Sequence, residues 1–143
     1  MHHLKVITYL LCTLILIGSA EANQLTILHI NDHHSHLRAD GRMSLKINDE
    51  KTRVKSGGFP VVVSTFNNLS KGKKNVLKLH AGDAITGDLY YTLFKGEADA
   101  ALMNQVCFDA FAIGNHEFDD GDTGLAKFLD FLGKGDCNTP ALA

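Results

Sequence analysis

Two kinds of apolar segment alternate along the chain after residue 23. The runs 24–30, 75–83 and 108–115 are short and rich in aliphatic residues, a pattern that predicts three strands. The first run, "QLTILHI", has no polar face, so we expect a strand that is buried on both sides within a parallel sheet.

Longer segments with helical spacing follow each of these runs. In 57–74, which opens with glycines and a proline suited to a first helical turn, the apolar positions are Val62, Val63, Phe66 and Leu69. The segment 87–106 also predicts a helix, broken at Gly96. A last helix is expected over 122–132, with a stripe formed by Leu125, Phe128, Leu129 and Leu132.

The segment 42–56 differs from the rest because polar and apolar residues alternate around the turn signal Asn48-Asp49. It predicts an exposed hairpin or a long excursion. The remaining order is strand, helix, strand, helix, strand, helix. That order favours a layered α/β fold with parallel strands at its centre.

Polar residues stand at the carboxyl end of every predicted strand. They are Asp32 and His34 after the first strand, Asp83 after the second, and Asn115 and His116 after the third. In open parallel sheets, ligands bind beyond the carboxyl ends of the strands. We therefore expect the three groups to meet at one rim of the sheet.

These residue types suit a metal site. In extended backbone Asp32 and His34 would point the same way, giving a carboxylate and an imidazole side by side. Asp83 offers an oxygen able to bridge two cations, and Asn115 a neutral carbonyl oxygen. A donor set without thiolates suits zinc, manganese, cobalt or iron.

Two cations about 4 Å apart activate water and clamp a phosphoryl group during in-line attack. His116 would then donate a proton or stabilise developing charge, and Asp119, three residues later, would orient it. Each feature alone is weak, since an Asp-x-His pair fits a structural role equally well and a Gly-Asp pair is most often a turn.

The other histidines of these segments carry no assigned chemistry. His29 and His80 fall inside or at the end of predicted strands, where we expect structural roles. His33 and His36 are expected at the rim, exposed or near a substrate.

Residues 1–22 predict export. A short cationic start precedes the apolar run "VITYLLCTLILIG", and small residues at Ala20 and Ala22 resemble a cleavage site. The run is short for a membrane span. We expect a signal peptide over 1–22 and a mature protein, from about residue 23, that is periplasmic or extracellular without stable membrane association.

Charge and cysteine content add little more. The net charge of −2 and the absence of a basic patch argue against a nucleic-acid partner. After residue 22 the cysteines are Cys107 and Cys137. In an oxidising compartment they would form a disulfide or remain two separate core residues, and the sequence leaves both open.

Taken in order, "ILHINDHHSH", "LHAGDAITGD" and "AIGNHEFDDG" resemble the signature blocks of the 5′-nucleotidase family within the calcineurin-like metallophosphoesterases. The resemblance covers essentially all of 23–143, and "GNHEFD" is highly specific. The stretch "AGDAITGDLYYTLFKGEADAALMN" is similar to bacterial exported nucleotidases that cleave NAD and 5′-nucleotides, with UDP-sugar hydrolases as close relatives. The family resemblance implies that this part of the chain forms the amino-terminal half of a layered α/β metallophosphoesterase sandwich.

The resemblance also implies roles for single residues. It implies two divalent ions, with Asp32 and His34 as the Asp-x-His pair that binds the first metal. Asp83 matches the aspartate that bridges the two metals, and Asn115 matches the asparagine ligand of the second. His116 matches the catalytic histidine that stabilises the transition state, and Asp119 its orienting partner.

The family takes further metal ligands, mostly histidines, from later segments, and no histidine follows His116 here. A separate carboxy-terminal domain that grips the nucleoside has no counterpart either, so we expect 23–143 to be part of a longer metallophosphoesterase. For that parent we expect hydrolysis of nucleotide phosphate esters, with cleavage of the NAD pyrophosphate as an extension. The alternatives are a 2′,3′-cyclic nucleotide phosphodiesterase, a UDP-sugar hydrolase, or an inactive fragment that binds metal weakly.

Overall fold

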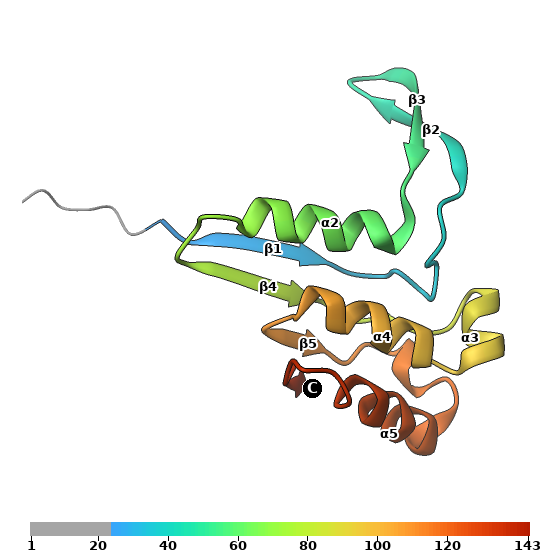
Figure 1. Ribbon diagram of the computed structural model, residues 1–143. Helices are drawn as coiled ribbons and strands as arrows, with labels where there is room; N and C mark the ends of the chain where they lie inside the picture. The colour runs from blue at the N-terminus through green and yellow to red at the C-terminus, as the bar shows by residue number, and fades with distance from the viewer. Residues whose placement is uncertain (1–23) are drawn as a thin grey trace, which may run out of the picture.

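The computed structural model describes residues 24–143, so the predicted signal peptide over 1–22 lies outside the described residues. A four-stranded parallel sheet with the order β1-β4-β5-β6 forms its centre (Figure 1). The strands are β1 (Thr26–Ile30), β4 (Val76–His80), β5 (Ala110–Ala112) and β6 (Ala141–Leu142). The predicted α/β class with parallel strands is confirmed, whereas the two residues of β6 carry too little pattern to be predicted.

Helices connect successive strands of this sheet. They are α2 (Gly58–Ser70), α3 (Leu89–Phe94), α4 (Glu97–Val106) and α5 (Gly121–Leu132), with a 3₁₀ helix η1 (His116–Phe118) after β5. Helix α4 contacts both α2 and α5, and α2 lies along β1 (Figure 1). Because crossovers between parallel strands are right-handed, strands added in one direction place their helices on the same face of the sheet.

The core lies between these helices and the sheet. Its fully buried large apolar side chains are Phe59, Phe111, Phe128, Ile85, Met103 and Val106. The predicted stripe of α5 is confirmed, with Phe128 and Leu132 buried. On α2 the prediction for Phe66 holds, but Leu69 is 47% exposed because the last turn of the helix extends past the core.

The prediction that β1 is buried on both faces is wrong for the described residues. Alternate residues of β1 point away from the helices, and Ile27 is 54% exposed on that side, together with His29. Only one face of the sheet is covered by helices, so the second apolar face of "QLTILHI" has no layer against it within residues 24–143.

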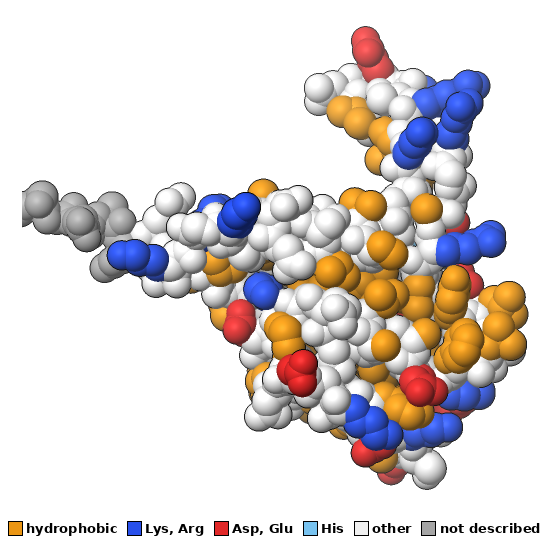
Figure 2. Space-filling view, in the orientation of Figure 1, with side chains coloured by type: hydrophobic (Ala, Val, Ile, Leu, Met, Phe, Trp, Pro, Cys, Tyr) orange, Lys and Arg blue, Asp and Glu red, His pale blue; other side chains and the backbone are white. Residues whose placement is uncertain are grey.

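The predicted hairpin forms as β2 (Gly41–Ile47) and β3 (Glu50–Ser56) and extends away from the sheet (Figure 1). Its turn residues Asn48 and Asp49 have φ values of 51° and 68°, the left-handed conformation that a two-residue hairpin turn requires. Apolar side chains on this hairpin and over α3 remain exposed (Figure 2).

The predicted break at Gly96 separates α3 from α4. Lys95 and Gly96 both adopt left-handed backbone, with φ values of 51° and 89°. A Cβ on Gly96 would lie 2.9 Å from the Phe128 ring, so a glycine permits both the turn and the close contact with α5.

A disulfide joins Cys107, at the end of α4, to Cys137, in the segment before β6. The Cα atoms lie 5.4 Å apart. This resolves the alternative that the sequence left open, in favour of a pair. Within residues 24–143 no helix is both long and apolar enough to cross a membrane.

We expect the disulfide to contribute to stability by restricting the unfolded chain. For a separation of 30 residues, the loop-entropy model gives about 3–4 kcal/mol. Urea unfolding of the oxidised protein and of the Cys107→Ser/Cys137→Ser variant measures this difference. Reducing agent should destabilise the parent chain and leave the double variant unchanged, and equal sensitivity of both proteins would contradict the assignment.

Candidate metal centre

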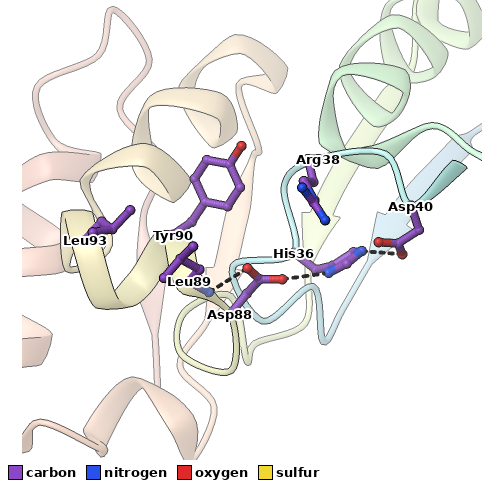
Figure 3. Close-up of a pocket in the computed structure, with 7 residues that line it drawn as sticks. All are labelled: His36, Arg38, Asp40, Asp88, Leu89, Tyr90 and Leu93. Carbon is purple, nitrogen blue, oxygen red and sulfur yellow. Dashed lines mark hydrogen bonds and ion pairs between the residues drawn. The ribbon is translucent and has the colours of Figure 1, made fainter.

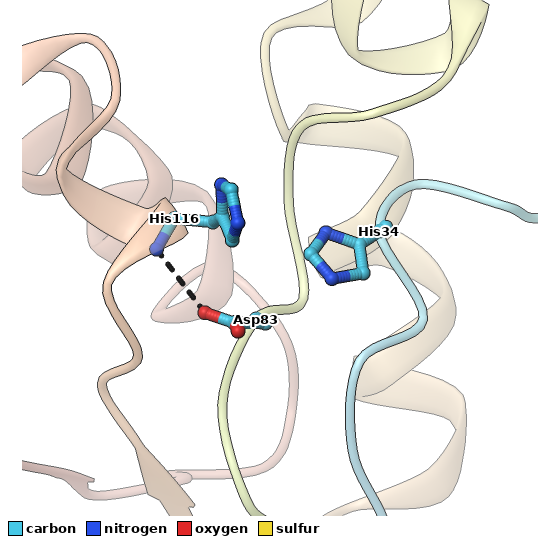
Figure 4. Close-up of side chains that lie close together, drawn as sticks. All are labelled: His34, Asp83 and His116. Atoms are coloured by element: carbon cyan, nitrogen blue, oxygen red, sulfur yellow. Dashed lines mark hydrogen bonds between the residues drawn. The ribbon is translucent and has the colours of Figure 1, made fainter.

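Three loops meet beyond the carboxyl ends of β1, β4 and β5 (Figure 4). One ligand atom each from His34, Asp83 and His116 lies within 4.8 Å of the others, and all three side chains are partly exposed. The rings of His34 and His116 have their centroids 4.9 Å apart. The predicted convergence of the three polar groups at one rim is therefore confirmed for these residues.

The first loop differs from the extended geometry that the sequence suggested. Asp32 and His34 have φ values of 52° and 46°, in the left-handed region, because β1 ends at Ile30 and the chain turns. Their side chains still lie together, with His34 Nε2 3.6 Å from Asp32 Oδ1. A hydrogen bond from Asn31 lowers the pKa of Asp32, and the nearby His34 lowers it further.

Backbone hydrogen bonds join the first loop to the second. The N–H groups of Asp32, His34 and Ser35 donate to the carbonyl groups of three successive residues, at 3.0, 3.2 and 2.9 Å. The acceptors are Gly82, Asp83 and Ala84. The two loops thus continue the pairing of β1 with β4 although neither is a strand.

Asp83 is held from the side of the third loop. Its Oδ1 accepts a hydrogen bond from the His116 N–H at 3.1 Å. A Cβ on Gly114 would lie 2.2 Å from that same Oδ1, so no other residue fits at this position without displacing the carboxylate. The glycine of "GNHEFD" is thus required by the close approach of Asp83.

Glu117, the fourth residue of "GNHEFD", is a part of the site that sequence reasoning missed. Its carboxylate is fully buried and accepts N–H groups from both loops. The donors are Asp83 at 3.0 Å, Ala84 at 2.7 Å, Ile85 at 3.3 Å and Gly114 at 2.6 Å. The sequence carries no signal that separates Glu117 from its polar neighbours Asn115, His116 and Asp119, because its acceptor role depends on amides from another loop.

His116 and Asp119 form the predicted pair. His116 Nδ1 lies 2.9 Å from Asp119 Oδ2, and both side chains are exposed by about two fifths (40% and 43%). The hydrogen bond that His116 donates to Asp119 raises the pKa of His116, and the same contact lowers the pKa of Asp119. With Nδ1 engaged, Nε2 is the atom through which His116 can contact a ligand.

Asn115 lies in the same loop, directly before η1, and is exposed. The structure thus brings together Asp32, His34, Asp83 and His116, places Asp119 behind His116, and leaves the ligand role of Asn115 a prediction. His116 is as close to the other donors as a ligand would be, although the sequence assigns it to catalysis.

His36 and His33, which were both predicted at the rim, differ in position. His36 stays at the rim as predicted, next to Asp40 and Asp88 in a hollow of about 390 Å³ (Figure 3). Its hydrogen bonds to Asp88 and Asp40 raise its pKa. The expectation of a rim position for His33 is wrong, because its side chain is 9% exposed and turns inward to His80.

The donor chemistry of this cluster fits divalent cations of the zinc, manganese, cobalt or iron type. It combines imidazole nitrogen with carboxylate oxygen, and both cysteines of the described residues are held in the disulfide. The left-handed backbone at Asp32, His34 and Asp83 is strain of the kind that collects at functional sites.

A parallel sheet with acidic and histidine donors at its carboxyl rim is the arrangement expected of the metallophosphoesterases that the three signature blocks resemble. Residues 25–139 match the family model described as calcineurin-like phosphoesterase, and the chain belongs to that family. This confirms the family resemblance seen in the three signature blocks.

Within this family, the chain is similar to several proteins named as nucleotidases. The chain is 54% identical over 112 residues to an NAD 5′-nucleotidase of Haemophilus influenzae and 51% identical over 109 residues to a probable 5′-nucleotidase of Treponema pallidum. These alignments cover 78% and 76% of this chain and 18% of each relative. A solved structure of the Haemophilus influenzae NAD nucleotidase superposes with a TM-score of 0.71 at 50% identity, over 83% of this chain and 20% of that one.

The chain therefore spans about a fifth of the length of the relatives it matches. The matched fifth contains every candidate residue of the centre, since these lie between Asp32 and Asp119.

Replacing Glu117 by Gln should loosen the Asp83 loop. One carboxylate oxygen becomes an NH₂ group that faces backbone N–H donors, so we expect a loss of about 3 kcal/mol in the free energy of unfolding. Urea unfolding together with amide exchange at Ala84 measures the effect. Glu97→Gln, which removes an exposed carboxylate at the start of α4, is the matched control, and equal effects of both changes would contradict the role of Glu117.

Proposed function

We propose that the protein containing this chain hydrolyses phosphate esters of nucleotides at a centre of two divalent cations. The observation that carries the proposal is the convergence of His34, Asp83 and His116 from three separate loops, in a chain of the calcineurin-like phosphoesterase family. The printed names of the relatives, 5′-nucleotidase and NAD 5′-nucleotidase, support a nucleotide or dinucleotide as the substrate.

The proposed ligands divide between the cations according to their loops. Asp32 and His34 would hold the first, Asp83 would be shared between the two, and Asn115 would serve the second. Two cations require about eight donors between them, so the remaining ligands come from parts of the protein beyond these four residues.

The cations, when bound, supply Lewis-acid activation of a phosphoryl oxygen and of water. By holding these cations, Asp83 and His34 would set the position of the phosphoryl group. His116, held through Nδ1 by Asp119, presents Nε2 to that group and stabilises charge on the oxygens as water adds and the nucleoside oxygen leaves with a proton. The products are a nucleoside and inorganic phosphate.

We also propose that the protein is exported. The amino-terminal 22 residues have the composition of a signal peptide. The disulfide between Cys107 and Cys137 supports this, since such bonds persist in the periplasm or outside the cell and are rare in the cytosol.

The function can be tested in a complete enzyme. In this chimera, residues 24–143 of the present chain replace the matching segment of the Haemophilus influenzae NAD 5′-nucleotidase. We expect this chimera to release phosphate from AMP and to cleave NAD with Mn²⁺ or Co²⁺, and to lose activity with a chelator. The 143-residue chain alone should be inactive because it lacks donors. An inactive but folded chimera would contradict the proposal.

In the same chimera, His116→Ala should lower kcat by about 10²- to 10⁴-fold, because one positioned proton donor is removed. Asp119→Asn acts only through the orientation of His116 and should cost about 10- to 100-fold. Rates with AMP at saturating Mn²⁺ measure both. Lys73→Gln, an exposed change in the turn after α2, is the control, and a His116→Ala enzyme within threefold of the parent would exclude a catalytic role.

A further inference from the structure

A continuous set of buried polar side chains lies directly beneath the first two loops of the centre. Ser35 and Asp99 are fully buried, His80 is 1% exposed, and the His33 side chain is 9% exposed. These residues come from the loop after β1, from the end of β4 and from the first turn of α4. None of them belongs to the proposed ligands or to the His116–Asp119 pair.

Each member of the set contacts the next. The Gly82 N–H donates to His80 Nδ1 at 3.2 Å, and His80 Nε2 lies 2.9 Å from His33 Nδ1. His33 Nε2 lies 3.2 Å from Asp99 Oδ1, and Ser35 Oγ donates to Asp99 Oδ2 at 3.1 Å. The rings of His33 and His80 are enclosed by aromatic side chains, with Phe59 and Phe111 among them.

The direction of every hydrogen bond in this set follows from its first member. Because His80 Nδ1 accepts from a backbone N–H, it carries no proton, and His80 must carry its proton on Nε2. That proton is donated to His33 Nδ1, which leaves the His33 proton on Nε2, where it is donated to the carboxylate of Asp99. Both rings therefore carry a proton on Nε2, and every side-chain nitrogen and oxygen of these four residues has a partner.

We propose that His80, His33 and Asp99 are positioning residues, a one-directional hydrogen-bond relay that holds the two loops bearing Asp32, His34 and Asp83 in register. His33 stands between Asp32 and His34 in the chain, so anchoring its ring fixes the backbone of both neighbours. His80 binds the N–H of Gly82, the residue directly before Asp83.

Two features of the structure favour this role over simple core filling. The loops adopt left-handed backbone at Asp32, His34, Ser35 and Asp83, which costs free energy and persists only where surrounding contacts over-determine it. Apolar side chains of similar size in place of a buried polar network are often neutral or even stabilising, so stability alone does not account for such a network. Its distinctive property is the fixed geometry that it imposes.

The anchor of the relay is well suited to hold charge. Asp99 is the third residue of α4, where the helix dipole favours a carboxylate, and Ser35 supplies its second donor. The relay therefore ties the loops to helix α4, an element of the core, rather than to another loop.

The first experiment measures the tautomers in the full 143-residue chain by two-bond ¹H–¹⁵N correlation spectra of the histidine rings. We expect protonated Nε2 and unprotonated Nδ1 for both His33 and His80. A proton on Nδ1 of either ring would overturn the proposed order.

The second experiment compares three variants by amide exchange at Asp32, His34 and Ser35, whose N–H groups bridge the loops. His33→Phe keeps the aromatic packing and removes both hydrogen bonds, so we expect at least tenfold faster exchange there. Asp99→Asn retains an oxygen that accepts a hydrogen bond from His33, so its exchange rates should stay close to those of the parent chain. Met103→Leu, equally buried one turn further along α4, is the control and should leave these amides unchanged.

The link to the metal centre is tested by Mn²⁺ binding to the chimera described above, carrying the same substitutions. This step rests on the proposed function, since the relay holds metal-binding loops only if that function is right. We expect the affinity to fall about tenfold in His33→Phe, as is usual for residues behind metal ligands, and to stay unchanged in Met103→Leu. Altered exchange together with no Mn²⁺ binding even to the unsubstituted chimera would refute the metal centre while supporting the relay. Normal exchange and affinity in His33→Phe would overturn the relay and leave the proposed function standing.

Discussion

The Glu117 carboxylate joins the loops that follow β4 and β5, because its two oxygens accept N–H groups from Asp83, Ala84, Ile85 and Gly114. The loop after β1 is bonded in turn to the carbonyl groups of the segment 82–84. All three loops of the centre thus depend on the position of one short segment, and that position is set by one buried acid. A buried charge with this number of partners is costly to leave unsatisfied, so the arrangement is strongly specified.

Much of the architecture follows from hydrophobic pattern. The runs around 24–30, 75–83 and 108–115 became β1, β4 and β5, and the polar residues after them met at the carboxyl rim, since parallel strands end on one side. The hydrophobic pattern did not predict the backbone conformation of the loops that follow the strands. Periodicity carries no information on whether the chain stays extended after Ile30, so the left-handed turn at Asp32 and His34 was not predicted.

Buried polar residues were the second source of error. Four histidines lie within ten residues, between His29 and His36, and composition alone does not tell which ring faces inward. His33 does so because His80 and Asp99, 47 and 66 residues away in the chain, offer matching partners. Such partners exist only once the fold is known. The same holds for Glu117, whose acceptor role becomes visible when the amides of the Asp83 loop surround it.

The strand order β1-β4-β5-β6 follows the order of synthesis. Each strand that leaves the ribosome can therefore pair with a neighbour that is already present, and no early strand must wait for a distant partner in this part of the sheet. The polar rim is then assembled progressively, beginning with Asp32 and His34 and ending with the loop that carries His116. Such sequential docking shortens the time during which the apolar strands stand alone and open to aggregation.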